Sequence, residues 1–114
     1  MIQAIAFIVY PVKDMAVSRR FYEETLLLKT ESVGCEGRWA EYDIAGATFA
    51  ITDLNEKAVA GKGGAVAFEV DDLDAAVARL QAGSLVEPAF ETPVCRMAIA
   101  ADPDGNEFIL HKRK

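Results

Sequence analysis

The chain has 114 residues, of which 52% are hydrophobic, and a formal net charge of −6. This length and composition suit one compact domain that needs no disulfide bonds, because such a domain buries roughly two-thirds of the surface its unfolded chain exposes. The acidic balance argues against a nucleic-acid partner, which needs clustered cations, and here the only cationic cluster is the terminal Lys112-Arg113-Lys114.

No segment approaches the ~20 consecutive apolar residues of a membrane span, and Met1 leads into an apolar run without a basic leader or a cleavage site. The sequence therefore predicts a cytoplasmic protein with no membrane partner. Cys35 and Cys95 are too few and too far apart for a disulfide framework or a metal knuckle, so we expect both thiols to be reduced and structural.

The first half of the chain predicts a strand, a helix and three more strands. Ala4 to Tyr10 is rich in β-branched and aromatic residues, and Pro11 is expected to end this strand because proline has no N–H for a ladder. Asp14 is a candidate N-cap for an amphipathic helix over Met15 to Leu26. Three short strands are expected next, with a tight turn at Ala45-Gly46 between the last two: Thr30 to Gly34, Trp39 to Ile44 and Ala47 to Thr52.

The second half repeats this order after a polar, glycine-rich segment, Asp53 to Gly64, which predicts a linker. Ala65 to Val70 predicts a strand, Asp71 or Asp72 a helix cap, and Gly83 the end of that second helix. The turn formers of Asp102 to Asn106 then predict a closing hairpin. The strands of this half are expected at Leu85 to Phe90, Cys95 to Ala101 and Glu107 to Lys112.

A strand, a helix and three strands, stated twice, indicate an α+β fold of two βαβββ modules. The modules are expected at about residues 1–54 and 64–114, within a single domain of residues 1–114. Each small sheet needs a partner or a helix layer to bury one face, so the two halves are expected to complete one core. A parallel α/β fold is less suitable because only two helices are predicted.

Three segments carry a resemblance to a known family: Val12 to Tyr22, Phe68 to Ala76, and Asp102-Pro103-Asp104-Gly105-Asn106. In this order and spacing they resemble the glyoxalase / bleomycin-resistance / extradiol dioxygenase superfamily, also called the vicinal oxygen chelate proteins. The resemblance implies two modules whose sheets curl into a cup that holds a small ligand, commonly in a homodimer. It also places Leu27, at the end of the first helix, at a position where the family usually has glycine. A glycine there suggests a left-handed backbone conformation, which Leu27 would then have to adopt.

The resemblance further assigns the family's four metal-ligand positions, which fall on Phe7, Ala50, Ala65 and Ile109. A divalent cation needs roughly three or four nitrogen, oxygen or sulfur ligands, and these four side chains offer none. We therefore expect no metal and no other cofactor. The metal-dependent activities of the family, which include lyases, isomerases, epimerases, dioxygenases and thiol transferases, are not expected in their usual form.

The last strand carries the only histidine, and His111 shares a face with Glu107 and Ile109 by the period of two. His111 is therefore expected to look along the wall of the presumed cup. Glu107 and His111 are roughly 13 Å apart on a regular strand, which is too far for two ligands of one ion. A solvated histidine with no role is the alternative for His111.

The hairpin at Ala45-Gly46 supplies the acidic candidate. A two-residue turn places Glu41 opposite Ala50 and Trp39 opposite Thr52, on the face where the family's metal would sit. Among apolar walls from Phe7, Ala50 and Ile109, Glu41 is a candidate general base with a raised pKa. The alternative is a carboxylate that reaches solvent or pairs with Arg38 or Arg96.

Arg96, Trp39 and Phe7 are further ligand-binding candidates. Arg96 can clamp an anionic ligand, or it can pair with an acidic residue and hold the closing hairpin. Trp39 and Phe7 can grip a planar or cationic ligand, or they can pack in the core.

Three kinds of function follow from these residues. The first is a metal-free protein that binds a small, partly apolar or aromatic molecule. The second is a metal-independent lyase or isomerase with Glu41 as general base, and with His111 or Arg96 stabilising charge. The third is a structural or dimerisation subunit with a filled cup. The ligand-binding residues of the first kind are expected to be Phe7, Trp39, Ala50, Arg96, Ile109 and His111.

Overall fold

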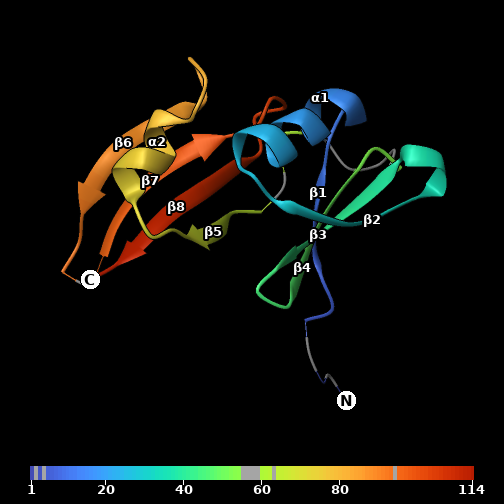
Figure 1. Cartoon of the computed structure of the whole chain (residues 1–114), viewed down its shortest axis with the longest axis horizontal. Helices are drawn as coiled ribbons and strands as arrows, with labels where there is room; N and C mark the ends of the chain where they lie inside the picture. The colour runs from blue at the N-terminus through green and yellow to red at the C-terminus, as the bar shows by residue number, and fades with distance from the viewer. Residues whose placement is uncertain (2, 4, 55–59, 63, 94) are drawn as a thin grey trace.

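The computed structural model describes residues 1, 3, 5–54, 60–62, 64–93 and 95–114. Two four-stranded sheets lie side by side, each with a helix from its own half of the chain (Figure 1). The strand order is β1-β4-β3-β2 in one sheet and β5-β8-β7-β6 in the other. Each module thus has the same βαβββ arrangement, as the sequence predicts. In the described part of the chain no helix is long and apolar enough to cross a membrane.

The elements of the first module follow one another over residues 8–52. They are β1 (Ile8–Pro11), α1 (Met15–Arg20), the π-helical turn η1 (Phe21–Thr25), β2 (Lys29–Gly34), the 3-10 turn η2 (Cys35–Gly37), β3 (Trp39–Ile44) and β4 (Ala47–Thr52).

The elements of the second module occupy residues 66–113. They are β5 (Val66–Glu69), α2 (Leu73–Ala78), β6 (Leu85–Glu91), β7 (Cys95–Ala101) and β8 (Glu107–Arg113).

Strand β1 differs from the strand expected at Ala4 to Tyr10. It starts at Ile8, where the parallel ladder with β4 begins, and it includes Pro11, which lies opposite Thr52. Pro11 is tolerated because β1 is an edge strand with one partner, so a missing N–H breaks no inner ladder. The expected start at Ala4 lies outside the described residues.

The first helix begins as predicted, because Asp14 Oδ1 accepts from the N–H groups of Ala16 (3.0 Å) and Val17 (3.2 Å). It does not continue as one α-helix to Leu26. After Arg20 the helix widens into η1, in which Leu26 N–H donates to Phe21 O, five residues back, at 3.0 Å. Spacing in the sequence did not separate these two kinds of turn.

The connection between the modules is only partly described. Residues 55–59 and 63 of the expected linker lie outside the described residues, so the module boundaries near 54 and 64 stay a prediction. Gly61 has φ +83°, and a Cβ at this position would meet the carbonyl oxygen of Asp104 at 2.3 Å. Glycine is therefore required where the connection passes the turn between β7 and β8.

The core is aromatic and continues from one module into the other. Phe49 on β4 packs edge-on against Phe68 on β5 with ring centroids 5.7 Å apart, and Phe21 lies 5.9 Å from Phe108. Tyr22 is fully buried between them and the sheet. Because these rings come from both halves, neither sheet buries its helix-bearing face alone.

A buried polar cluster adds directional contacts across the same boundary. Asp102 accepts four hydrogen bonds, from the Tyr22 hydroxyl and from three N–H groups of its own turn. Asn106 also donates to Pro11 O at 2.8 Å, and the Tyr10 hydroxyl donates to Glu107 O at 2.9 Å. The sequence predicted a turn at Asp102 to Asn106, and the structure shows that this turn also joins the modules.

Candidate functional site

The candidate site lies on the face of the first sheet that the helices do not cover. Along β3, Ala40 and Tyr42 are fully buried in the core, so Trp39 and Glu41 point to the opposite face. The ladder pairs Trp39 with Thr52 and Glu41 with Ala50, which confirms the predicted register. The register follows from the two-residue turn, where Ala45 and Gly46 both have positive φ.

Two aromatic rings and a carboxylate meet on this face. The rings of Phe7 and Trp39 are perpendicular, with centroids 5.6 Å apart, and Phe7 is 45% exposed. Trp39 Nε1–H donates to Glu41 Oε2 at 2.8 Å, while the Ser32 hydroxyl approaches Glu41 Oε1 at 3.5 Å. We call Phe7, Trp39, Glu41 and Ala50 the aromatic face.

Glu41 has no cationic partner on the part of the chain that the structure describes. Arg38, one alternative partner, instead binds Asp53 through Nε at 2.8 Å. Arg96, the other, lies on the helix-bearing face of the second sheet, next to Asp74 of α2 (3.4 Å) and Glu91 of β6 (3.6 Å). Arg96 is therefore not brought together with the aromatic face, and its contacts are those of the structural alternative.

The second module places two of the expected residues on its own uncovered face. Phe108 and Leu110 are buried in the core, so Ile109 and His111 point the other way. His111 Nδ1 lies 2.5 Å from Glu69 Oε1, on the neighbouring strand β5. This pairing was missed from the sequence, although the parallel β5–β8 register is the signal that would have found it.

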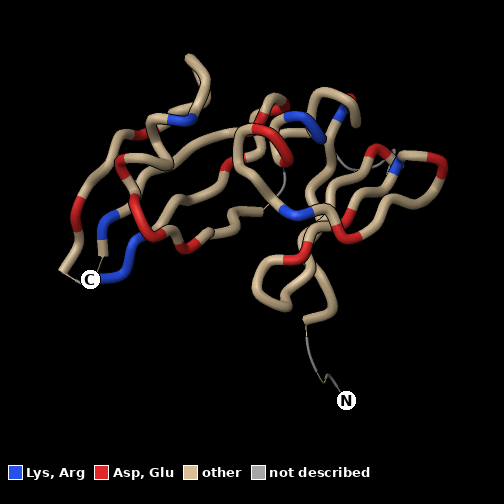
Figure 2. The backbone as a smooth tube through the Cα atoms, viewed as in Figure 1, with Lys and Arg blue, Asp and Glu red and all other residues tan. Residues whose placement is uncertain are grey.

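Glu69 is held from two sides. The backbone N–H of Arg113 donates to its Oε2 at 2.8 Å, and this bond, followed by the His111 ring, lowers the pKa of the Glu69 carboxyl. One group of cationic residues lies near this end of the second module, where β7 begins and β8 ends (Figure 2). Of these, Lys114 pairs with Glu91 at 3.1 Å, so part of the positive charge is already balanced.

The residues at the family's metal positions do not fit a metal ion. Ala50 and Ile109 present only hydrocarbon, and Phe7 presents a ring that packs on Trp39. His111 has Nδ1 turned to Glu69. On the uncovered face of β3, Glu41 accepts from Trp39, and Asp43 accepts from the N–H of Gly46 in the hairpin turn. Throughout the described ranges no three His, Cys, Asp or Glu side chains gather closely enough to hold an ion. We therefore derive no chemistry through a metal.

The fold and this face define a protein of paired βαβββ modules whose uncovered sheet surface carries aromatic and acidic side chains. The model of the Glyoxalase/Bleomycin resistance protein/Dioxygenase superfamily matches residues 4–110, and the chain belongs to this family. A comparison with curated proteins found no match.

Several solved structures share the fold. TnmS3, an antibiotic binding protein from Streptomyces sp. CB03234, is 28% identical with a TM-score of 0.83, and the match covers 99% of this chain and 98% of that one. A glyoxalase/bleomycin resistance protein from the same Streptomyces is 28% identical, with a TM-score of 0.76 over 97% and 100% of the two chains. Lactoylglutathione lyase from Agrobacterium tumefaciens has a TM-score of 0.76 at 19% identity, over 98% and 95% of the chains, which shows the fold alone.

Proposed function

We propose that this protein binds a small, partly apolar or aromatic molecule at the aromatic face, without a metal ion. The observation that carries the proposal is the Phe7–Trp39 pair, whose rings lie perpendicular on a face that no helix covers. Large apolar side chains gain free energy when they leave water, and a stacked aromatic ligand would add to that gain. Ala50, opposite Glu41 in the ladder, is small and fully buried, so it forms the apolar base of this face.

Glu41 supplies the polar contact of this proposed site. Its Oε2 is occupied by the indole N–H, whereas Oε1 has only the long contact with Ser32. A carboxylate oxygen accepts more than one hydrogen bond, so Glu41 can receive an O–H or N–H of the ligand while Trp39 holds it in place. The antibiotic-binding neighbour TnmS3, at 28% identity over almost the whole chain, supports a binding function of this kind.

A homodimer belongs to the same proposal. Apolar side chains on and beside β1 are strongly exposed: Ile5 by 83%, Phe7 by 45%, Ile8 by 42% and Val9 by 37%. Such a cluster on a single chain is a common sign of a contact surface. A second copy would cover it and enclose the ligand, and light scattering on the purified protein tests this through the molar mass.

The test of binding uses Trp39, which is the only tryptophan of the chain. A thermal-shift screen first identifies a ligand. Titration of the protein with that ligand should change the fluorescence emission of Trp39, with the same midpoint as the binding curve measured by calorimetry. Trp39→Ala should weaken binding by about 1–3 kcal/mol through lost stacking and burial, whereas Glu41→Gln should matter little for a neutral ligand. Elemental analysis of protein purified without chelator should find no stoichiometric transition metal.

Binding that leaves both the Trp39 emission and the affinity of Trp39→Ala unchanged would contradict this assignment. A matched control is Phe90→Ala, because Phe90 is a half-buried aromatic residue on β6, in the other sheet. Loss of binding in both variants to the same extent would indicate general damage instead of a local contact.

A second candidate function is a metal-independent lyase or isomerase with Glu41 as general base. It is favoured by the fixed position of Glu41, which Trp39 orients at 2.8 Å and which no described cation neutralises. Glu41→Gln should then abolish turnover and leave binding nearly intact, because the amide keeps the shape but cannot take a proton. A protein that neither binds nor converts any screened molecule would favour the third function, a structural subunit.

A further inference from the structure

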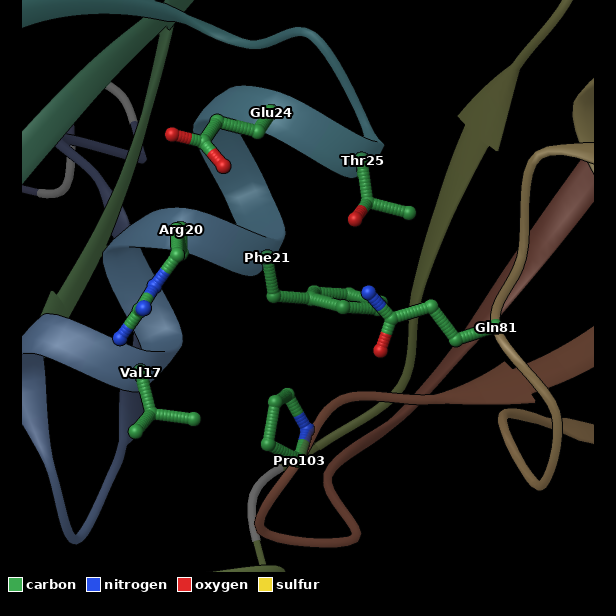
Figure 3. Close-up of a pocket in the computed structure, with 7 residues that line it drawn as sticks. All are labelled: Val17, Arg20, Phe21, Glu24, Thr25, Gln81 and Pro103. Carbon is green, nitrogen blue, oxygen red and sulfur yellow. The ribbon is translucent and has the colours of Figure 1, made fainter.

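A hollow lies between the two modules, on the side of the helices and apart from the aromatic face. Its volume is about 270 Å³. Figure 3 shows the first-module residues on one side of this hollow, with Gln81 and Pro103 of the second module facing them. We call it the seam hollow, and it is lined by Val17, Arg20, Phe21, Glu24, Thr25, Gln81 and Pro103.

The wall of the seam hollow is formed largely by the π-helical turn. Phe21, Glu24 and Thr25 all belong to η1, and Arg20 directly precedes it. Short π-helical segments are rare and occur frequently at functional sites, because the widened turn costs stability that a plain α-helix would keep. The second module fixes the end of this turn, since Arg79 donates to Thr25 O at 3.1 Å and to Glu24 O at 3.2 Å.

The seam hollow contains one positive and one negative side chain that do not neutralise each other. One residue earlier, Arg19 and Glu23 form an ion pair at 2.6 Å. Arg20 and Glu24 have the same spacing, yet they form no ion pair with each other or with any other residue in the described ranges. Figure 3 shows their side chains leaving successive turns on the same side of the hollow.

The remaining lining residues divide into an apolar and a polar part. Phe21 is only 5% exposed and forms a fixed apolar surface beside Val17 and Pro103. Thr25 and Gln81 add a hydroxyl and an amide, which can donate or accept. A ligand of this hollow therefore meets a small apolar surface with both charges at its border.

A zwitterion is the class of ligand that satisfies all these groups together. A simple anion would be attracted by Arg20 and repelled by Glu24, and a simple cation would meet the reverse. A neutral apolar molecule would make no contact with either charge, and both side chains are exposed and available. A zwitterion places its carboxylate against Arg20 and its ammonium against Glu24. The volume is near the lower end of ligand pockets, roughly 300 Å³, so the ligand is a small metabolite.

We propose that the seam hollow is a second ligand site, specific for a free α-amino acid with an apolar side chain. The carboxylate binds Arg20, the ammonium binds Glu24, and the side chain packs against Phe21, Val17 and Pro103. This site does not depend on the function proposed for the aromatic face, because the two share no residue.

The test is a titration of the full chain with L-phenylalanine and, separately, with L-leucine. Ligand-observed NMR monitors binding in each titration. The binding free energy per heavy atom that is usual for small ligands predicts a dissociation constant near the millimolar range for a molecule of this size. Phenethylamine lacks the carboxylate and 3-phenylpropionate lacks the ammonium, so each should bind about tenfold more weakly than L-phenylalanine. Equal binding of all three compounds would overturn the proposal.

Two variants assign the charges. Arg20→Gln should remove the preference for L-phenylalanine over phenethylamine, and Glu24→Gln should remove its preference over 3-phenylpropionate. Arg19→Gln is the matched control, because it deletes the same charge one residue away from the seam hollow, and it should keep both preferences. Trp39→Ala should also leave the binding of amino acids unchanged. Absence of a saturable signal, or equal loss in Arg19→Gln and Arg20→Gln, would exclude the site.

Discussion

At the scale of single residues, three carboxylates differ in the hydrogen-bond donors that surround them. Glu41 receives the indole N–H of Trp39, Glu69 receives a backbone N–H, and Asp102 receives four donors at once. The sequence identified the Glu41 position because register and alternation are local properties. It did not identify Glu69 as the partner of His111, because that contact joins residues 42 positions apart.

Glu23 gives a pH-dependent prediction at this scale. Its hydrogen bond from Arg19 (2.6 Å), supported by the Tyr42 hydroxyl (2.8 Å), lowers the pKa of the Glu23 carboxyl below its ordinary value of 4.5. A lowered folded-state pKa stabilises the fold above the unfolded-state pKa, and this contribution is lost as the pH falls through the folded-state value. Glu23→Gln should therefore cost about 1 kcal/mol of unfolding free energy at neutral pH and progressively less in acid.

Urea unfolding of the wild type and of Glu23→Gln between neutral and acidic pH measures this difference. Glu31→Gln on the exposed strand β2 is the control, because no described side chain binds Glu31. A difference between Glu23→Gln and the wild type that stays constant down to about pH 3 would show that the carboxylate is not what stabilises the fold.

Among the elements, those defined by a local signal were predicted well. As expected, Asp14 and Asp72 cap their helices, and Ala45-Gly46 fixes the β3–β4 hairpin. The strand expected at Leu85 to Phe90 is β6, an edge strand whose pairing with β7 shifts register twice. The π-helical turn was not predicted, because its apolar residues repeat much like those of an α-helix. The first strand was predicted but its ends were not, because they depend on where β4 offers a partner.

The turn after η1 yields a prediction about backbone strain. Leu27 has φ 59°, which is the left-handed conformation that the family resemblance suggested. Its side chain is 62% exposed. A left-handed residue other than glycine costs roughly 1 kcal/mol, and an exposed side chain returns little of it. Leu27→Gly should therefore raise the unfolding free energy by about 1 kcal/mol, which chemical denaturation measures.

Leu27 also lines an apolar hollow of about 200 Å³, together with Leu26, Leu28 and Phe68. A lowered stability of Leu27→Gly would therefore mean that this packing outweighs the strain. Ala45→Gly is a useful comparison, because Ala45 has φ 51° at an exposed turn and its side chain is a single methyl group. A gain in Ala45→Gly with a loss in Leu27→Gly would assign the difference to packing in that hollow.

At the scale of the whole molecule, the family and the two-module fold were predictable, because a repeated βαβββ order and three spaced motifs are visible in the sequence. The contacts between the modules were not, since they join distant residues. The Tyr22 hydroxyl binds Asp102 at 2.9 Å, and burial together with this carboxylate raises the pKa of Tyr22, so the hydroxyl remains a donor. Asp102 is itself only 5% exposed. A buried carboxylate whose donors come from both modules couples their stabilities.

Cooperative unfolding is the measurable consequence of this coupling. Trp39 emission reports on the first module, whereas far-ultraviolet circular dichroism reports on both, and we expect the same urea midpoint from the two signals.

Asp102→Ala leaves the Tyr22 hydroxyl and three N–H groups without their acceptor, and it should cost about 3 kcal/mol. Asp14→Ala is the matched control, because Asp14 accepts two N–H groups within its own module, from Ala16 (3.0 Å) and Val17 (3.2 Å), so about 1 kcal/mol is expected. Separate midpoints in the wild type, or equal losses in the two variants, would show that the aromatic packing of Phe21, Phe49, Phe68 and Phe108 holds the modules together without help from the polar cluster.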